Sequence, residues 1–250
     1  MSAINTEVGD GVATLTLDRP PVNAVRFEDL TEMLEAFRSV QDRDDVRAVV
    51  FTGSGDRAFV AGTDLNELAS LTAETAAESV MIVQDLVNLI YSFPVPVISA
   101  VNGPALGSGV AIACASDIRI ASTKASFILP EVNIGVMGGS AHVARFLPQG
   151  RARWMMYTGE PVSCEEAYRF GMVDKVVEPA DLMAEARALA LTIASKYPPA
   201  IRLAKAGLNG SEWLDLRDGY AYECELTVEL RRDQGSAEVS RAFLESRTKR

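Results

Sequence analysis

The fold is decided by residues 97–120, which read VISAVNGPALGSGVAIACASDIRI. The apolar run from Val95 to Val101 predicts a buried strand, and Ile118 to Ala121 predicts another. Between them, the small apolar residues from Gly109 to Ala115 favour a helix that packs close to other backbone. A strand, a helix and a second strand in this order indicate a crossover connection and hence parallel strands.

The same alternation extends toward the N-terminus and past residue 120. β-branched and apolar runs predict strands at residues 12–17, 47–53 and 126–129. Apolar residues at helical spacing predict helices at residues 27–40 and 76–91. We therefore predict an α/β fold with a largely parallel, buried sheet.

The last quarter of the chain has a different pattern. Helical stretches are predicted at residues 182–197, 200–208, 214–231 and 238–247, with Pro198-Pro199 between the first two. We accordingly divide the chain into an α/β core, residues 1–195, and a helical C-terminal region, residues 196–250.

Composition and charge exclude several classes of protein. The chain has 250 residues, 48% apolar and 23% charged, with a formal net charge of −10. An acidic chain argues against general nucleic-acid binding, which needs a basic face. No apolar run approaches the roughly 20 residues that cross a bilayer, and residues 1–10 lack the pattern of a signal peptide. We expect a cytoplasmic protein with no membrane or nucleic-acid partner.

Metal and nucleotide sites are not expected either. Cys114, Cys164 and Cys224 are too widely spaced for a metal pair and are expected to be reduced, mostly buried thiols. His142 is the only histidine, so a zinc site is not expected. The glycines match neither a P-loop nor a dinucleotide fingerprint, and Ser108 does not complete a Gly-x-Ser-x-Gly motif.

Two glycine-bearing turns are the candidate functional features. The first spans Phe59 to Leu65 and contains Gly62, and the second spans Asn102 to Val110. Each can bring unpaired backbone N–H groups to the start of a helix. If both turns faced one carbonyl, they would form an oxyanion hole. An ordinary strand-to-helix turn, with Thr63 or Asp64 as the helix cap, explains the first spacing equally well.

Glu131 is the candidate acid or base. It follows Pro130 in an otherwise apolar stretch, residues 127–136. Burial in such surroundings would raise its pKa and favour proton transfer near neutral pH. The alternative is a glutamate in an exposed loop.

These motifs together resemble the enoyl-CoA hydratase/isomerase (crotonase) family. The similarity includes both glycine turns and Pro130-Glu131-Val132-Asn133-Ile134-Gly135, and extends to residues 17–24 and 167–174. It covers nearly the whole chain, in order. The resemblance implies a core of repeated ββα units and a helical C-terminal region that serves oligomerisation and covers the active site. It also implies a homotrimer, or a hexamer built as a dimer of trimers.

The resemblance further implies an acyl-CoA thioester as substrate, with coenzyme A as part of that substrate and no other cofactor. The thioester oxygen would accept hydrogen bonds from the backbone N–H groups of Thr63 and Ser108, and Glu131 would transfer the proton. The other expected substrate-binding residues are Ala61, Gly62, Asp64 and Leu65 in the first turn, and Gly107, Gly109, Ala111 and His142.

One departure from the family pattern bears on the reaction. Typical hydratases of the family carry a second glutamate at the position of Ala111. Shifting a double bond needs one proton shuttle, whereas hydration divides its work well between two carboxylates. We therefore favour isomerisation slightly over hydration, with Asp64, Glu67 or Glu74 as possible replacement carboxylates.

A second departure leaves other activities open. His142 stands where the family commonly has glycine, just after Gly138-Gly139. A CoA-thioester hydrolase or a ring-processing relative could use this imidazole, and free CoA release lost in His142→Ala would identify such an enzyme. A non-catalytic CoA-binding protein is the third alternative.

Overall fold

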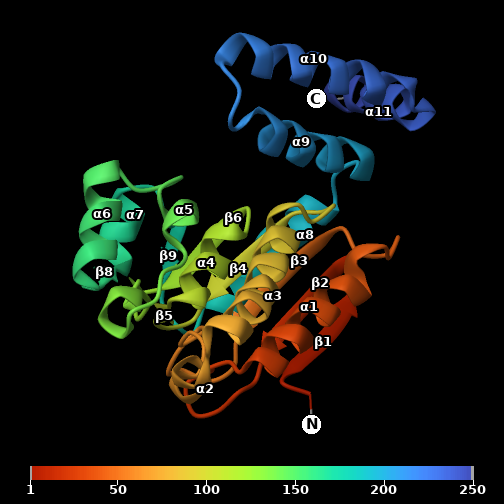
Figure 1. The fold of residues 1–250 in the computed structure, drawn as a ribbon. Helices are drawn as coiled ribbons and strands as arrows, with labels where there is room; N and C mark the ends of the chain where they lie inside the picture. The colour runs from red at the N-terminus through yellow and green to blue at the C-terminus, as the bar shows by residue number, and fades with distance from the viewer. Residues whose placement is uncertain (1, 249–250) are drawn as a thin grey trace.

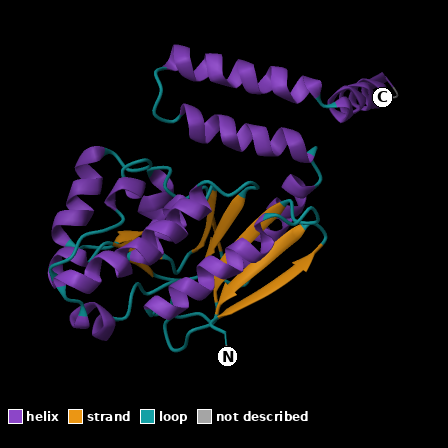
Figure 2. Cartoon of the chain, turned by 45° about the vertical axis from the view of Figure 1, so that its right-hand side comes forward, coloured by secondary structure: helices purple, strands orange, loops and turns teal. Residues whose placement is uncertain are grey.

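A six-stranded sheet forms the centre of the protein in the computed structural model, which describes residues 2–248 (Figures 1 and 2). Its strand order is β1-β2-β3-β4-β6-β9. The strands are β1 (Ile4–Gly9), β2 (Val12–Leu17), β3 (Ala48–Gly53), β4 (Val97–Val101), β6 (Ile118–Ser122) and β9 (Lys175–Val177). β1 pairs antiparallel with β2, and every other pair is parallel. The predicted α/β fold with a largely parallel sheet is confirmed.

Side chains that alternate along the strands build a core on each face of this sheet. On one face, Val12, Ala48 and Val50 pack against α8 (Leu182–Ala194). That helix presents Leu182, Ala186, Ala190 and Ala194, which are four residues apart and therefore lie on one side. The small alanines let the helix approach the sheet closely.

The other face of the sheet is covered by three helices. They are α1 (Phe27–Gln41), α3 (Ala73–Tyr91) and α4 (Ser108–Ala115). Phe37 of α1 and Phe51 of β3 anchor this side, with ring centroids 5.8 Å apart. Residues 109–115 of α4 are all buried, which explains their small size.

A second, three-stranded sheet lies beside the first and carries the turns of interest. It contains β5 (Ala105–Leu106), β7 (Ser126–Ile128) and β8 (Val162–Ser163), in the order β5-β7-β8. The chain passes from β4 in the large sheet to β5 in the small one and then into α4, and β6 and β7 repeat this step before a 3-10 helix (Glu131–Ile134). The remaining helices of the core are α2 (Leu65–Ser70), α5 (Ser140–Val143), α6 (Gln149–Thr158) and α7 (Cys164–Arg169).

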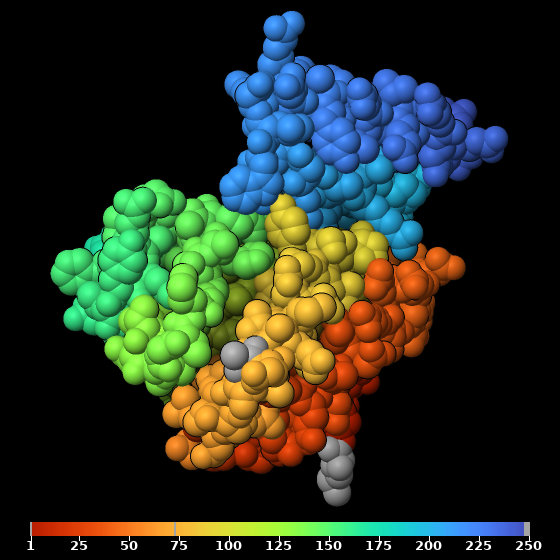
Figure 3. Space-filling view, viewed as in Figure 1, coloured from red at the N-terminus to blue at the C-terminus, as the bar shows by residue number. Residues whose placement is uncertain are grey.

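Three C-terminal helices stand apart from the sheet (Figures 1 and 2), and the C-terminal residues, blue in Figure 3, project from one side of the molecule. They are α9 (Pro198–Ser211), α10 (Leu216–Arg232) and α11 (Gln234–Thr248). Polar contacts attach α9 to the core: buried Lys205 donates to Asp117 Oδ2 at 2.7 Å and lies 3.3 Å from the Val95 carbonyl oxygen. The division that we place at residue 195 falls in the connection between α8 and α9.

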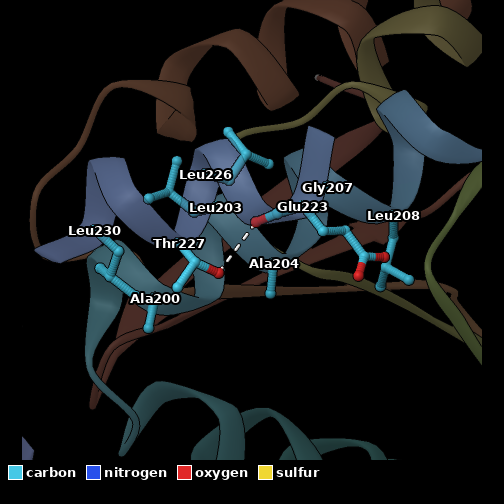
Figure 4. Close-up of a pocket in the computed structure, with 9 residues that line it drawn as sticks. All are labelled: Ala200, Leu203, Ala204, Gly207, Leu208, Glu223, Leu226, Thr227 and Leu230. Atoms are coloured by element: carbon cyan, nitrogen blue, oxygen red, sulfur yellow. Dashed lines mark hydrogen bonds between the residues drawn. The ribbon is translucent and has the colours of Figure 1, made fainter. Parts of the chain in front are cut away.

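A hollow lies between α9 and α10 (Figure 4). Its lining is mostly aliphatic and includes Leu203, Leu226 and Leu230, and its polar Thr227 hydroxyl donates to the carbonyl oxygen of Glu223. None of the predicted site residues lines this hollow.

The structure corrects the sequence prediction at the edges of the sheet. β1 and β9 were not predicted, because β1 buries only Ile4 among its six residues and β9 has three residues.

Cys114 and Cys164 are buried, whereas Cys224 is exposed. Within residues 2–248, the helices are all too short or too polar to cross a membrane.

Candidate active site

The first glycine turn is held by a short parallel bridge to the segment before α1. Val25 pairs with Thr63 across this bridge: its N–H donates to Gly62 O at 2.9 Å, and its carbonyl accepts from Asp64 N at 2.8 Å. Gly62 has φ +83°, a conformation that favours glycine. Val25 is hydrogen-bonded to the Gly62 carbonyl and to the Asp64 N–H, on either side of Thr63. The Thr63 N–H therefore points away from Val25, and it donates to no described residue.

The acidic residues after this turn serve the local structure. Asp64 is the N-cap of α2 and accepts from Asn66 N at 2.8 Å and from Glu67 N at 3.3 Å. Glu67 in turn accepts from Phe27 N at 2.6 Å. Asp64, and not Thr63, is therefore the N-cap of α2. Both carboxylates accept from backbone N–H groups, and a role for Asp64, Glu67 or Glu74 in place of a glutamate at position 111 stays a prediction.

The second glycine turn leads directly into α4. Gly107 has φ +52°, precedes the first helical residue and donates its N–H to Ile128 O at 2.9 Å. Ser108 begins the helix, so its N–H has no partner within the helix. It donates to no other residue that the structure describes.

The two turns lie against each other. Val60, within the first turn, bridges Ala105, and its carbonyl accepts from Leu106 N at 2.9 Å. Gly109 packs on the same residue so closely that a Cβ there would lie 2.3 Å from Val60 O. The predicted proximity of the turns is therefore present, although a shared ligand for Thr63 and Ser108 remains a prediction.

Glu131 lies beside Gly107 of the second turn. The side chain is buried, with 8% exposure, and a Cβ placed on Gly107 would lie 3.1 Å from its Oε1 atom. Its Oε2 atom is buried and has no hydrogen-bond partner within residues 2–248. Burial raises the pKa of this carboxyl group, as expected from the sequence.

The cause of this burial differs in part from the sequence prediction. Within the apolar stretch 127–136 that we expected to surround Glu131, Phe127 and Leu129 are buried, whereas Val132 and Ile134 are 41% and 45% exposed. The 3-10 helix instead turns Glu131 alone inward, toward Gly107 and Gly138. Contact with Gly107, from another segment of the chain, thus contributes to the desolvation of the carboxylate.

The other predicted substrate-binding residues fall into two groups. Ala111 is buried on α4, and a Cβ on Gly139 would lie 3.8 Å from the Ala111 Cβ and 3.7 Å from Gly107 O. Leu65, in contrast, is 64% exposed at the start of α2, and Ala61 is partly exposed. Of the buried group, Gly107 lies against Glu131, and the exposed residues lie on the first turn.

His142 is half-buried beside Tyr91, with ring centroids 6.4 Å apart. Burial and the nearby Arg145 lower the pKa of its imidazole, and Glu212 partly opposes this. Among the described residues its buried Nδ1 has no partner, and it forms no hydrogen bond with Glu131 or Ser108. Its predicted place in the acyl pocket remains a prediction.

One contributor to this site was missed by sequence reasoning. Val25 positions the first turn through its backbone groups, and no motif distinguishes it from other core valines. In the described part of the chain, no group of three His, Cys, Asp or Glu side chains could hold a metal ion.

The fold and this site define a class of α/β protein in which two glycine turns present backbone donors beside a buried carboxylate. Residues 7–250 match the model of the enoyl-CoA hydratase/isomerase family. The chain belongs to this family, as the resemblance predicted, and it is an enzyme of the crotonase fold that acts on acyl-CoA.

Individual relatives agree with this assignment. The chain is 36% identical to crotonyl-CoA hydratase of Syntrophomonas wolfei, covering 96% of this chain and 94% of the relative. It is 35% identical to short-chain-enoyl-CoA hydratase of Clostridium acetobutylicum, covering 94% and 92%. The crystal structure of enoyl-CoA hydratase from Bacillus anthracis superposes with a TM-score of 0.93 at 31% identity, covering 98% of this chain and 96% of the other.

Proposed function

We propose that this enzyme transfers a proton at C2 of an enoyl-CoA thioester, with Glu131 as its single acid and base. The thioester oxygen accepts hydrogen bonds from the N–H groups of Thr63 and Ser108. The observation that carries the proposal is the buried Glu131 carboxyl group, whose Oε2 has no partner within residues 2–248, next to the start of α4. A raised pKa suits a carboxylate for taking and returning a proton near neutral pH.

The reaction that one carboxylate serves best is double-bond isomerisation. Glu131 removes a proton from C2 of a 3-enoyl-CoA, and the electrons of the broken C–H bond form a thioester enolate. The two backbone donors stabilise its oxygen, and one such donor is typically worth about 3 kcal/mol in the transition state. Protonated Glu131 then returns the proton to C4, which leaves the double bond at C2 and restores the carboxylate.

Hydration of a 2-enoyl-CoA is the second candidate. The names of the two relatives above, a crotonyl-CoA hydratase and a short-chain-enoyl-CoA hydratase, favour it. Ala111 argues against hydration, because it provides no second carboxylate on α4.

The C-terminal helices support a homo-oligomer, proposed as a trimer or a dimer of trimers. Large apolar side chains on α10, α11 and the connection before them are exposed, among them Trp213 at 77%, Leu216 at 90% and Phe243 at 62%. Apolar patches of this kind commonly mark protein contacts. Acyl-CoA metabolism in the cytoplasm remains part of the proposal.

Turnover of a 3-enoyl-CoA and of a 2-enoyl-CoA, measured side by side, tests the proposal. We expect wild type to form the conjugated product from the first substrate and Glu131→Gln to lose this activity by about 10²–10⁴-fold. Glu165→Gln, which removes an exposed carboxylate on α7, is the matched control. Unchanged turnover of both substrates by Glu131→Gln would refute the assignment of Glu131.

A further inference from the structure

Two polar side-chain atoms at the start of α4 have hydrogen-bonding capacity that the chain does not fill. They are Ser108 Oγ and Glu131 Oε2, both buried and both without a partner within residues 2–248. Buried polar atoms in proteins nearly always have a hydrogen-bond partner, so a buried atom without one in the chain indicates a bound ligand or water. Glu131 is more than nine-tenths buried, so its Oε2 atom is well shielded from bulk solvent.

The backbone brings the residues that carry these two atoms close together. Gly107 directly precedes Ser108, and a Cβ on Gly107 would lie 3.1 Å from Glu131 Oε1. Ser108 is the first residue of α4, a helix of eight residues. Ser108 therefore lies at the end of the helix that adjoins Glu131.

Ser108 also shares a helix face with Ala111. Residues three apart lie one above the other on an α-helix, and side chains lean toward the helix N-terminus. A hydroxyl group at position 108 thus occupies the same side of α4 from which a second carboxylate at position 111 would project.

We propose that Ser108 Oγ and Glu131 Oε2 together hold one water and that the enzyme adds this water to C3 of a 2-enoyl-CoA. Ser108 then positions the water. Ala111 cannot do so, because its methyl side chain forms no hydrogen bond. This inference rests on the proposed function, since it uses the same carboxylate and the same oxyanion hole, and it assigns a positioning residue to hydration, the second candidate reaction.

The addition needs no second base. Glu131 takes one proton from the water while the water oxygen forms a bond to C3, and the C2=C3 π electrons move to the thioester as an enolate. Ser108 Oγ accepts the other water hydrogen and aims the oxygen lone pair at C3. Protonated Glu131 then delivers its proton to C2. The elements of water are added across the double bond, and the carboxylate is regenerated.

The test compares two activities that use Glu131 differently. Exchange of the C2 protons of butyryl-CoA with D₂O requires the proton shuttle alone, whereas hydration of crotonyl-CoA also requires a positioned water. We expect the ratio of hydration rate to exchange rate to fall at least about tenfold in Ser108→Ala. Ser108→Thr keeps a hydroxyl group and should restore most of the ratio.

Ser163→Ala is the matched control, because Ser163 is an exposed N-cap serine of α7 outside the site. Its ratio should equal that of wild type. A wild-type ratio in Ser108→Ala, or an equally low ratio in Ser108→Thr, would overturn the role of the hydroxyl group. Exchange that persists in Glu131→Gln would instead overturn the proposed function, so the two failures are distinguishable.

Discussion

Substitution of Gly109 by alanine should separate the two glycine turns. A Cβ at this position would lie 2.3 Å from Val60 O and 2.8 Å from Val60 Cβ. Both atoms belong to or directly adjoin buried backbone, so neither can rotate away. Restoring an ordinary contact of about 3.4 Å requires the start of α4 to move by roughly 1 Å relative to Val60.

This movement has two measurable consequences. Overpacking of a buried site typically costs about 1–3 kcal/mol of unfolding free energy, which for a chain of this size lowers Tm by several degrees. Ser108 directly precedes Gly109, so the same shift moves its N–H away from that of Thr63. A displacement of about 1 Å, or the loss of one oxyanion donor, should lower kcat by about 10²-fold.

Gly150→Ala is the control. Gly150 lies near the start of α6, and a Cβ there would meet no atom within 4 Å. Alanine is favoured over glycine in helices by up to about 1 kcal/mol, so this variant should keep its activity and its Tm or gain slightly. The assays are thermal unfolding and enoyl-CoA turnover. A folded Gly109→Ala enzyme with kcat within about threefold of wild type would refute the reasoning.

The remaining predictions concern Lys205, Ala111 and Glu131. Lys205→Met leaves Asp117 without its buried partner and should lower the unfolding free energy in urea by about 3 kcal/mol; an unchanged midpoint would contradict the role of this pair. Ala111→Glu should raise the rate of crotonyl-CoA hydration relative to isomerisation by about tenfold or more, and an unchanged ratio would contradict the view that Ala111 limits hydration. Because burial raises the pKa of Glu131, kcat/KM should fall as pH drops through that raised pKa, at higher pH than for an exposed glutamate. The same shift means that native stability is lost as pH rises through it, so Glu131→Gln should have the higher Tm above that pH.

The sequence predicted the central elements because their patterns are local. Helical spacing predicted residues 27–40 and 76–91, and the structure has Phe27–Gln41 and Ala73–Tyr91. β-branched runs likewise predicted β2, β3 and β6. The edge strand β1 escaped prediction because five of its six residues are not buried, so the alternation that marks a half-buried strand is weak.

The candidate site was predictable in its residue types but not in its geometry. Glycines at 62, 107 and 109 indicated close approaches, and all three are buried in the structure. That Val60 bridges Ala105, across 45 positions of the chain, follows from tertiary packing and leaves no local signal. The burial of Glu131 against Gly107, despite the exposure of Val132, depends on the same packing.

The most direct test of the central claim is exchange of the C2 protons of butyryl-CoA in D₂O, followed by NMR with wild type and Glu131→Gln. The account predicts enzyme-dependent exchange by wild type, and a loss of about 10²–10⁴-fold in the variant. Exchange at the wild-type rate by a folded Glu131→Gln enzyme would contradict the claim that this carboxylate moves the proton.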